Sequence, residues 1–215
     1  MPTATPVSPS ALAGLVVSRC GPLLDTARER GVAVRVGVDG ALDDTTGPLA
    51  DLVAEAALAA GVGVVRVRAR DFLHRRSVRL EHGAGDVDTA YERWVDWAAL
   101  QREVLEPLAD PARLGWLPRL RDPDDDRPAR EAVRPAAPGV LAVVDGPYLL
   151  RWELAGDLDL VLHLDTSDAA LRRAVPEGDP RPGAWRRYVE ETDPAGRADL
   201  VVRAEHPGRP ALLSG

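Results

Sequence analysis

Three common residue types are missing from this chain of 215 residues, which contains no lysine, no asparagine and no isoleucine. All 27 basic residues are therefore arginine. The absence of lysine excludes any reaction that needs a side-chain amine, since the arginine guanidinium stays protonated in proteins. The joint absence of all three types is typical of a GC-rich coding sequence.

Cysteine, positive charge and long apolar runs are scarce as well. Cys20 is the only cysteine, which excludes intramolecular disulfides and cysteine-based zinc sites. No apolar run reaches the ~18 residues of a membrane span, and residues 1–10 lack the features of a secretory signal. The net charge of −7 argues against nucleic acid and anionic membranes as partners. We therefore expect a cytoplasmic protein that binds neither.

Short β-branched runs alternate with longer helical segments along the chain, which predicts an α/β protein. A single domain over residues 1–215 is expected, with a doubly wound five-stranded parallel sheet. Pro48 is expected to open the second helix, and the Pro- and Asp-rich segment 110–138 to be irregular, with a short hairpin. The predicted strands are 32–38, 62–68, 140–144, 158–164 and 200–203, and the predicted helices are 11–30, 49–60, 97–108, 168–175 and 183–191.

The loop after the first strand carries the most informative motif. It reads VDGALDDTTGPLAD from Val38 to Asp51 and resembles, without a gap, the VDGxxGxGKTTLAD loop of uridine kinase-like proteins. Four further segments resemble the same family in the same order: ARDFLHRRSVRLEHG (69–83), YERWVDWAALQREVLEPL (91–108), VVDGPYLLRWEL (143–154) and RYVEETDPAGRADLVV (187–202). The resemblance implies a P-loop NTPase fold of the nucleoside kinase type, ATP and Mg²⁺ as cofactors, and a nucleoside as the phosphate acceptor.

The resemblance fails where phosphate chemistry needs it. A working Walker A loop is G-x-x-x-x-G-K-[ST], with a lysine on the β/γ-phosphates and a hydroxyl on Mg²⁺. Counting from Gly40, the chain has Thr45 for the second glycine, Thr46 for the lysine and Gly47 for the hydroxyl residue. Asp43 and Asp44 would each repel a phosphate charge by about 3 kcal/mol at ~5 Å and an effective dielectric of ~20. The phosphate loop is therefore predicted to be degenerate.

Of the other positions that matter in this family, some carry the family's residue in this chain and others do not. The catalytic acid of the family's D-x-F motif is replaced by Arg70, and Asp71 could act as the base only if the backbone turns there. Asp145 matches the acid that helps hold Mg²⁺ through water, although Asp-Gly after a strand is also an ordinary turn signal. The remaining candidates are Arg172 and Arg173 as lid residues on the phosphates, in a segment that departs from the family's arginine-rich lid, and Arg79, His74 and Tyr148 as substrate contacts.

Two functions follow from this pattern. The coherent loss of lysine, metal-binding hydroxyl and base predicts a pseudoenzyme, a catalytically impaired nucleoside kinase homologue that binds a small metabolite such as a nucleoside, or a protein partner, without a cofactor. The alternative is an active ATP-dependent nucleoside kinase, using ATP and Mg²⁺ with a non-standard loop. An unrelated reaction in the same cleft is a third reading. Binding of MgATP distinguishes the first two.

Overall fold

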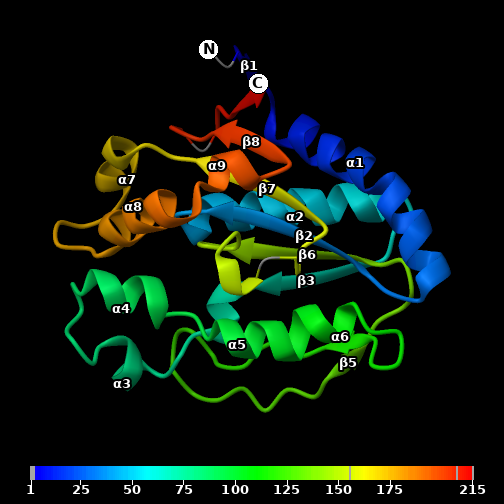
Figure 1. Cartoon of the computed structure of the whole chain (residues 1–215), viewed down its shortest axis with the longest axis horizontal. Coiled ribbons are helices and arrows are strands. Elements are labelled where there is room, and N and C mark those ends of the chain that lie inside the picture. Colours follow the sequence, from blue (N-terminus) through cyan, green and yellow to red (C-terminus); the bar gives the residue numbers. More distant parts are fainter. Residues whose placement is uncertain (1–2, 155, 207, 215) are drawn as a thin grey trace.

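A central sheet organises the chain in a computed structural model that describes residues 3–154, 156–206 and 208–214. Its strand order is β1-β9-β8-β7-β2-β6-β3 (Figure 1). The five predicted strands are confirmed as a parallel set: β2 (Val34–Gly40), β3 (Val64–Arg68), β6 (Leu141–Gly146), β7 (Leu160–Asp165) and β8 (Leu200–Arg203). Two antiparallel strands that the sequence analysis missed extend one edge, namely β9 (Ala211–Ser214) and β1 (Thr3–Pro6).

Helices cover both faces of this sheet. The helices are α1 (Pro9–Arg30), α2 (Asp43–Ala59), α3 (Arg76–Arg79), α4 (Val87–Glu92), α5 (Trp97–Leu100), α6 (Glu106–Leu108), α7 (Asp168–Ala174), α8 (Arg181–Thr192) and α9 (Pro194–Arg197). A π-helical turn at Gln101–Leu105 joins α5 to α6, and β4 (Gly115–Trp116) pairs with β5 (Arg134–Pro135) in the otherwise irregular segment 110–138. No helix in the described ranges is long and apolar enough to cross a bilayer.

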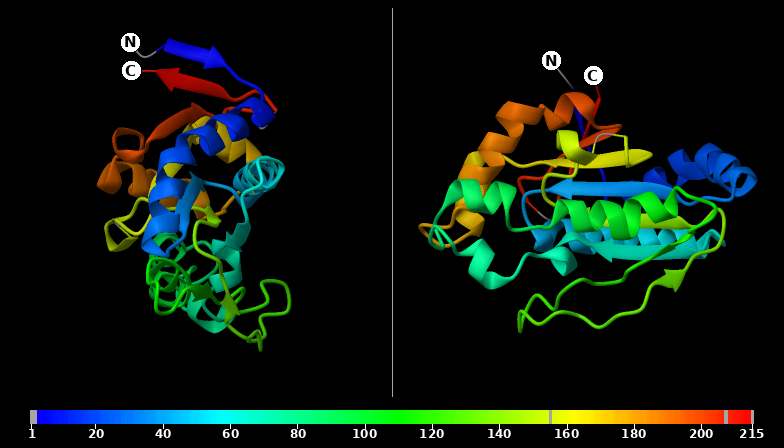
Figure 2. Two further views of the ribbon diagram at one scale, coloured as in Figure 1. Left: turned by 90° about the vertical axis from the view of Figure 1, so that its right-hand side faces the viewer. Right: turned by 60° about the horizontal axis from the view of Figure 1, so that its bottom comes forward.

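Two apolar clusters lie on opposite faces of the sheet, since side chains alternate between faces along a strand. Val36 and Leu162 pack with α1 and α2 on one face. Val67 and Val144 pack with α4 to α6 and α8 on the other. The two turned views in Figure 2 show these layers, with the 110–138 segment beyond α5 and α6. This is the layered arrangement of a doubly wound α/β protein.

The second helix begins earlier than the sequence analysis predicted. Pro48 was expected to open it, but α2 starts at Asp43, so Pro48 lies inside the helix. Pro48 is the sixth residue of α2 and therefore lies beyond the first four N–H groups, which have no acceptor inside a helix. Because proline has no N–H group, it removes one helical hydrogen bond, the one to the backbone carbonyl oxygen of the exposed Asp44. The helix caps at Asp96 and Ser167 are confirmed, and each side chain accepts a hydrogen bond from the backbone three residues on.

A buried carboxylate joins the middle of the sheet to α8. Asp39, at the end of β2 and fully buried, accepts hydrogen bonds from the backbone N–H of Leu149 at 2.8 Å and from the Tyr188 hydroxyl at 3.0 Å. The ring Nδ1 of His163 lies 2.7 Å from the same carboxylate. Burial, and then the nearby Asp39 charge, raise the pKa of Tyr188. His163 therefore has a structural role in the core.

The topology places a crevice at the carboxyl end of β2. From this strand the chain builds β3 and β6 on one side and β7 and β8 on the other. Ligands of open α/β sheets bind at such a switch point, beyond the carboxyl ends of the strands. That edge faces α4, α7 and α8 in Figure 1. Arg187 holds α8 beside α4 through ion pairs with Asp88 and Glu92, at 2.9 and 2.7 Å.

Candidate functional site

The segment that the sequence analysis aligned with a phosphate-binding loop forms the first turn of α2. Only the buried Ala41 and Leu42 separate β2 from this helix. The N–H groups of Thr45 and Thr46 both donate to the carbonyl oxygen of Leu42, at 3.1 and 3.0 Å. A phosphate-binding loop needs successive N–H groups that converge on an anion. Here two of those N–H groups are used inside the helix.

Thr46, at the position of the Walker lysine, is fully buried. Its hydroxyl donates to Oδ2 of Asp145 at 3.0 Å. Its methyl group packs on Gly40, where an added Cβ would lie only 2.8 Å from Thr46 Cγ2. A short side chain thus closes the space between the loop and β6, and it cannot reach a bound phosphate as a lysine would.

Arg66, a residue that the sequence analysis did not select, supplies the nearest cation. It comes from β3, and its Nη1 lies 2.6 Å from Oδ1 of Asp145. Its Nε donates to Asp51 at 2.8 Å, and its Nη2 donates to the carbonyl oxygen of Gly47 at 3.3 Å. The alternation of Val and Arg in β3 was the available signal, because a half-buried arginine on a strand needs an acidic partner.

The predicted metal ligand is therefore engaged within the protein. Asp145 is 3% exposed, with Nη1 of Arg66 paired to Oδ1 by charge and the Thr46 hydroxyl hydrogen-bonded to Oδ2. Among the described residues, Oδ1 itself accepts no hydrogen bond. A Mg²⁺ ion would have to displace the guanidinium to reach it. No group of three or more metal-ligating side chains occurs in the part of the chain that the structure describes. The residues present do not fit Mg²⁺ and a triphosphate held in the Walker manner.

Two adjoining cavities lie at this edge. The first, which we call the phosphate cavity, has a volume of 430 Å³. The second, the acceptor cavity, has a volume of 240 Å³. Asp43, Arg70 and Arg181 line both of them. The phosphate cavity is also lined by Asp44, Gly47, Asp51, Arg68 and Asp145, whereas the acceptor cavity is also lined by Leu73, Arg79, Ala90, Trp94, Val95 and Tyr148.

Asp43 is the carboxylate placed between the two cavities. Its side chain is exposed to the cavity space, yet protein surrounds it. Desolvation raises its pKa, and the charge of Asp145 raises it further, against the opposing effect of Arg70 and Arg181. Asp43 therefore holds a proton more readily than an ordinary aspartate.

Asp71, the predicted base, lines neither cavity. Its carboxylate lies 3.6 Å from Nε of Arg119, and its backbone carbonyl accepts from Leu120 and Arg121. Desolvation raises its pKa, although Arg119 opposes this. Arg70, which the sequence analysis aligned with the family's catalytic acid, lines both cavities instead.

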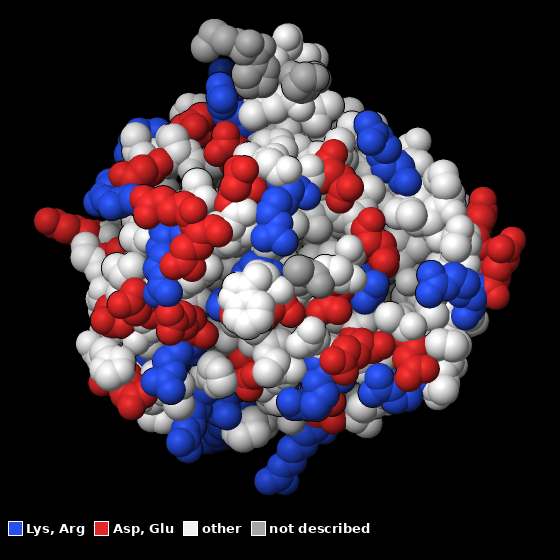
Figure 3. Space-filling view, in the orientation of Figure 1, with Lys and Arg blue, Asp and Glu red and all other residues white. Residues whose placement is uncertain are grey.

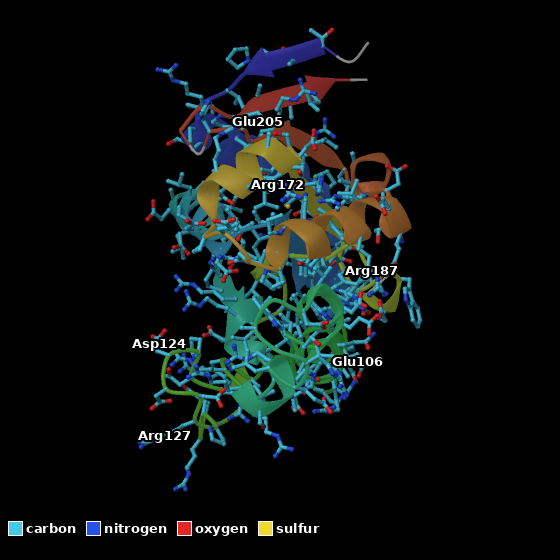
Figure 4. The ribbon with its side chains drawn as sticks, turned by 90° about the vertical axis from the view of Figure 1, so that its left-hand side faces the viewer. Glu106, Asp124, Arg127, Arg172, Arg187 and Glu205 are labelled. Atoms are coloured by element: carbon cyan, nitrogen blue, oxygen red, sulfur yellow. The ribbon has the colours of Figure 1, made fainter. Side chains whose placement is uncertain are left out.

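The two arginines that the sequence analysis predicted as lid residues, Arg172 and Arg173, lie outside both cavities. Arg172 pairs with Asp168 at 2.7 Å on the exposed side of α7, and neither it nor Arg173 lines the two cavities. Figure 4, which views this edge, shows Arg172 on α7, apart from the loop that carries Asp124. Arg181, at the start of α8, lines both cavities and pairs with Asp179 at 2.9 and 2.7 Å. It lies within the segment VPEGDPRPG, whose departure from the family's lid concealed it.

Of the three predicted substrate contacts, two line the acceptor cavity and one does not. Arg79 and Tyr148 line the acceptor cavity, and Tyr148 takes a left-handed backbone conformation with a φ of 60°. His74 is not among the lining residues, and its Nδ1 lies 3.7 Å from Asp96. On the face shown in Figure 3, arginines and acidic residues are interleaved, so the net negative charge is not gathered into one patch there.

Comparison with known proteins reveals the fold. No family model matches the sequence, and no curated protein matches it. A possible uridine kinase from Bacillus stearothermophilus is similar with a TM-score of 0.66 and 18% identity, over 85% of this chain and 98% of that one. A protein from Silicibacter sp. TM1040, provisionally assigned as a fructose transport system kinase, is similar with a TM-score of 0.61 and 18% identity, over 86% and 95%. The chain has the P-loop kinase fold. At this identity the likeness concerns the fold alone.

Proposed function

We propose that this protein is a catalytically impaired relative of the uridine kinase-like enzymes, a pseudoenzyme whose cleft binds a small metabolite. The observation that carries the proposal is the ion pair between Arg66 and Asp145, completed by the Thr46 hydroxyl. It uses the acid that would hold Mg²⁺.

The free energies favour this reading. Removing one partner of a buried ion pair typically costs 3–5 kcal/mol, because the other charge is left without compensation. A metal that drew Asp145 away from Arg66 would meet a penalty of that kind. A triphosphate would also approach Asp43 and Asp44, each of which opposes a phosphate charge by about 3 kcal/mol at ~5 Å and an effective dielectric of ~20.

Calorimetric titration with MgATP tests the proposal. We expect no binding up to about 1 mM, which corresponds to a binding free energy weaker than about −4 kcal/mol. Thermal-shift measurements with uridine and other nucleosides, with magnesium alone as the blank, test whether the acceptor cavity binds a metabolite. Micromolar affinity for MgATP, or turnover of ATP with a nucleoside, contradicts the proposal.

An active kinase with a non-standard loop is the second candidate, and one observation favours it. Asp43 lies between the cavities beside Arg70 and Arg181, and its pKa is raised by desolvation, so it is the carboxylate best placed to accept a proton. Replacing Asp43 by Asn separates the two functions. It would lower phosphoryl transfer by about 10²–10⁴-fold in an active enzyme, whereas a pseudoenzyme has no turnover for it to lower.

A further inference from the structure

The acceptor cavity has more positive than negative charge on its wall. Arg70, Arg79 and Arg181 line it, and the carboxylate of Asp43 is their counterpart there. The phosphate cavity has the opposite balance, because four carboxylates line it together with three arginines. Most of the remaining wall of the acceptor cavity is apolar, including Leu73, Ala90, Val95 and Pro147.

We propose that the acceptor cavity binds a small organic anion, with its charged group among Arg70, Arg79 and Arg181 and its ring against the apolar wall. This inference rests on the proposed metabolite-binding function and names the ligand's class. It also departs from a neutral nucleoside as the ligand, because the proton acceptor that would serve a hydroxyl is replaced by a guanidinium at Arg70.

The three arginines keep donors for a ligand. Arg79 uses Nε for the carbonyl oxygen of His74 at 2.8 Å and Nη2 for Asp126 at 3.3 Å. Arg181 uses Nε and Nη2 for Asp179. A guanidinium carries five N–H donors in a fixed fork. Among the described residues, these bonds leave the Nη1 group of each arginine without an acceptor, so it can serve an anion.

Arg70 is the least constrained of the three. Its Nη2 lies 3.6 Å from Asp124, a distance too long for a hydrogen bond, and its side chain is 40% exposed. Arg79 and Arg181, which also line the cavity, are held in place by ion pairs with Asp126 and Asp179. Arg70 can then move to complete the contact with an anion.

The size of the cavity limits the ligand. Its 240 Å³ falls below the ~300–1,000 Å³ of pockets that enclose drug-sized molecules. One ring with one acidic group fits this volume better than a nucleoside triphosphate. Either a carboxylate or a phosphomonoester provides the anion, and both accept charge-assisted hydrogen bonds from arginine.

Paired probes of equal shape test the charge requirement. Benzoate against benzamide measures the preference for a carboxylate, and phenyl phosphate against phenol measures the preference for a phosphomonoester, each by calorimetric titration of the full chain. We expect the anion of at least one pair to bind about tenfold or more tightly than its neutral counterpart, the typical effect of a hydrogen bond to a charged group.

Substitutions then locate that preference. Arg70→Gln should reduce it by about tenfold, Arg70→Lys should retain most of it, and Arg75→Gln, on an exposed residue of the same segment outside the cavity, should leave it unchanged. Circular dichroism melts confirm that each variant is folded.

Three results would overturn the anion proposal: equal affinity of charged and neutral probes, an unchanged preference in Arg70→Gln, or no binding of either anion up to about 1 mM. If uridine stabilises the chain while neither anion binds, the metabolite-binding function stands and the anion proposal fails. Micromolar binding of MgATP would instead contradict the proposed function.

Discussion

The two cavities share a border but differ in how their charges are satisfied. In the phosphate cavity, the lining carboxylates Asp51 and Asp145 form ion pairs with Arg66, which lies outside the lining. The Thr46 hydroxyl also donates a hydrogen bond to Asp145. In the acceptor cavity, Arg70 lies 3.6 Å from its partner Asp124, and Arg79 keeps donors for which the described residues provide no acceptor. The comparison teaches that two neighbouring cavities of one fold can differ in how far the protein itself pairs the charges around them.

The largest effect should come from removing the acid at the centre of the phosphate cavity. Asp145→Ala leaves Arg66 half-buried without its closest partner, and we expect a loss of about 3 kcal/mol in the free energy of unfolding. Urea denaturation measures this. Asp44→Asn, exposed in the same cavity, is the control and should change stability by less than about 0.5 kcal/mol. Similar values for both variants would mean that the pairing of Asp145 with Arg66 does not contribute to stability.

A smaller loss is expected from the hydroxyl that replaces the lysine amine. Thr46→Val removes a buried donor from Asp145 and should cost about 1–2 kcal/mol. A double-mutant cycle with Asp145→Asn should give a coupling of at least about 0.5 kcal/mol, because the two side chains are in contact. Simple additivity of the two substitutions would show that the hydrogen bond contributes nothing to stability.

The stability of the protein should depend on pH through Asp43, which lies between the two cavities. Desolvation and Asp145 raise the pKa of Asp43 above its usual 3.8 in the folded chain, so the folded state binds more protons than the unfolded state and stability falls as pH rises through that range. Asp43→Asn should therefore stabilise the protein near neutral pH by less than about 1 kcal/mol, since the exposed side chain is screened by solvent. The gain should disappear below the unfolded pKa. Urea titrations at several pH values measure it, and a gain that persists in acid would contradict this explanation.

The smallest effect is expected from the arginine that sequence position alone placed on the phosphates. Arg172→Gln breaks an exposed pair with Asp168 on α7 and should change stability by less than about 0.5 kcal/mol. Urea denaturation of this variant measures the change in the free energy of unfolding. A loss above about 1 kcal/mol would indicate a role in the fold beyond that exposed ion pair.

The fold could be predicted because its signals are local. The β-branched runs before residues 40 and 146 mark buried strands, and Ser167 and Asp96 mark helix starts by their side-chain chemistry. β1 and β9 escaped prediction because they are short and pair across almost the whole length of the chain, and β1 is exposed. β9 pairs with β8, and β1 then pairs with β9. No local sequence pattern indicates such a long-range pairing.

The site was predictable only in part. The missing lysine and the Asp145 position could be read directly from the motif. The use of Arg66 as the partner of Asp145 could not, because it depends on the register of β3 beside β6. The orientation of Asp71 toward Arg119 likewise depends on the backbone of a single helical turn, which one sequence does not define.

Trp94 gives the acceptor cavity an optical reporter of its own. Its half-buried indole lines this cavity and also the neighbouring hollow beside residues 123–126 and 176–180. A molecule that enters will replace water next to this ring, and indole emission changes when the polarity around it changes. Occupancy can therefore be followed by intrinsic fluorescence in dilute solution, with no attached dye, and a Trp94→Phe variant supplies the blank.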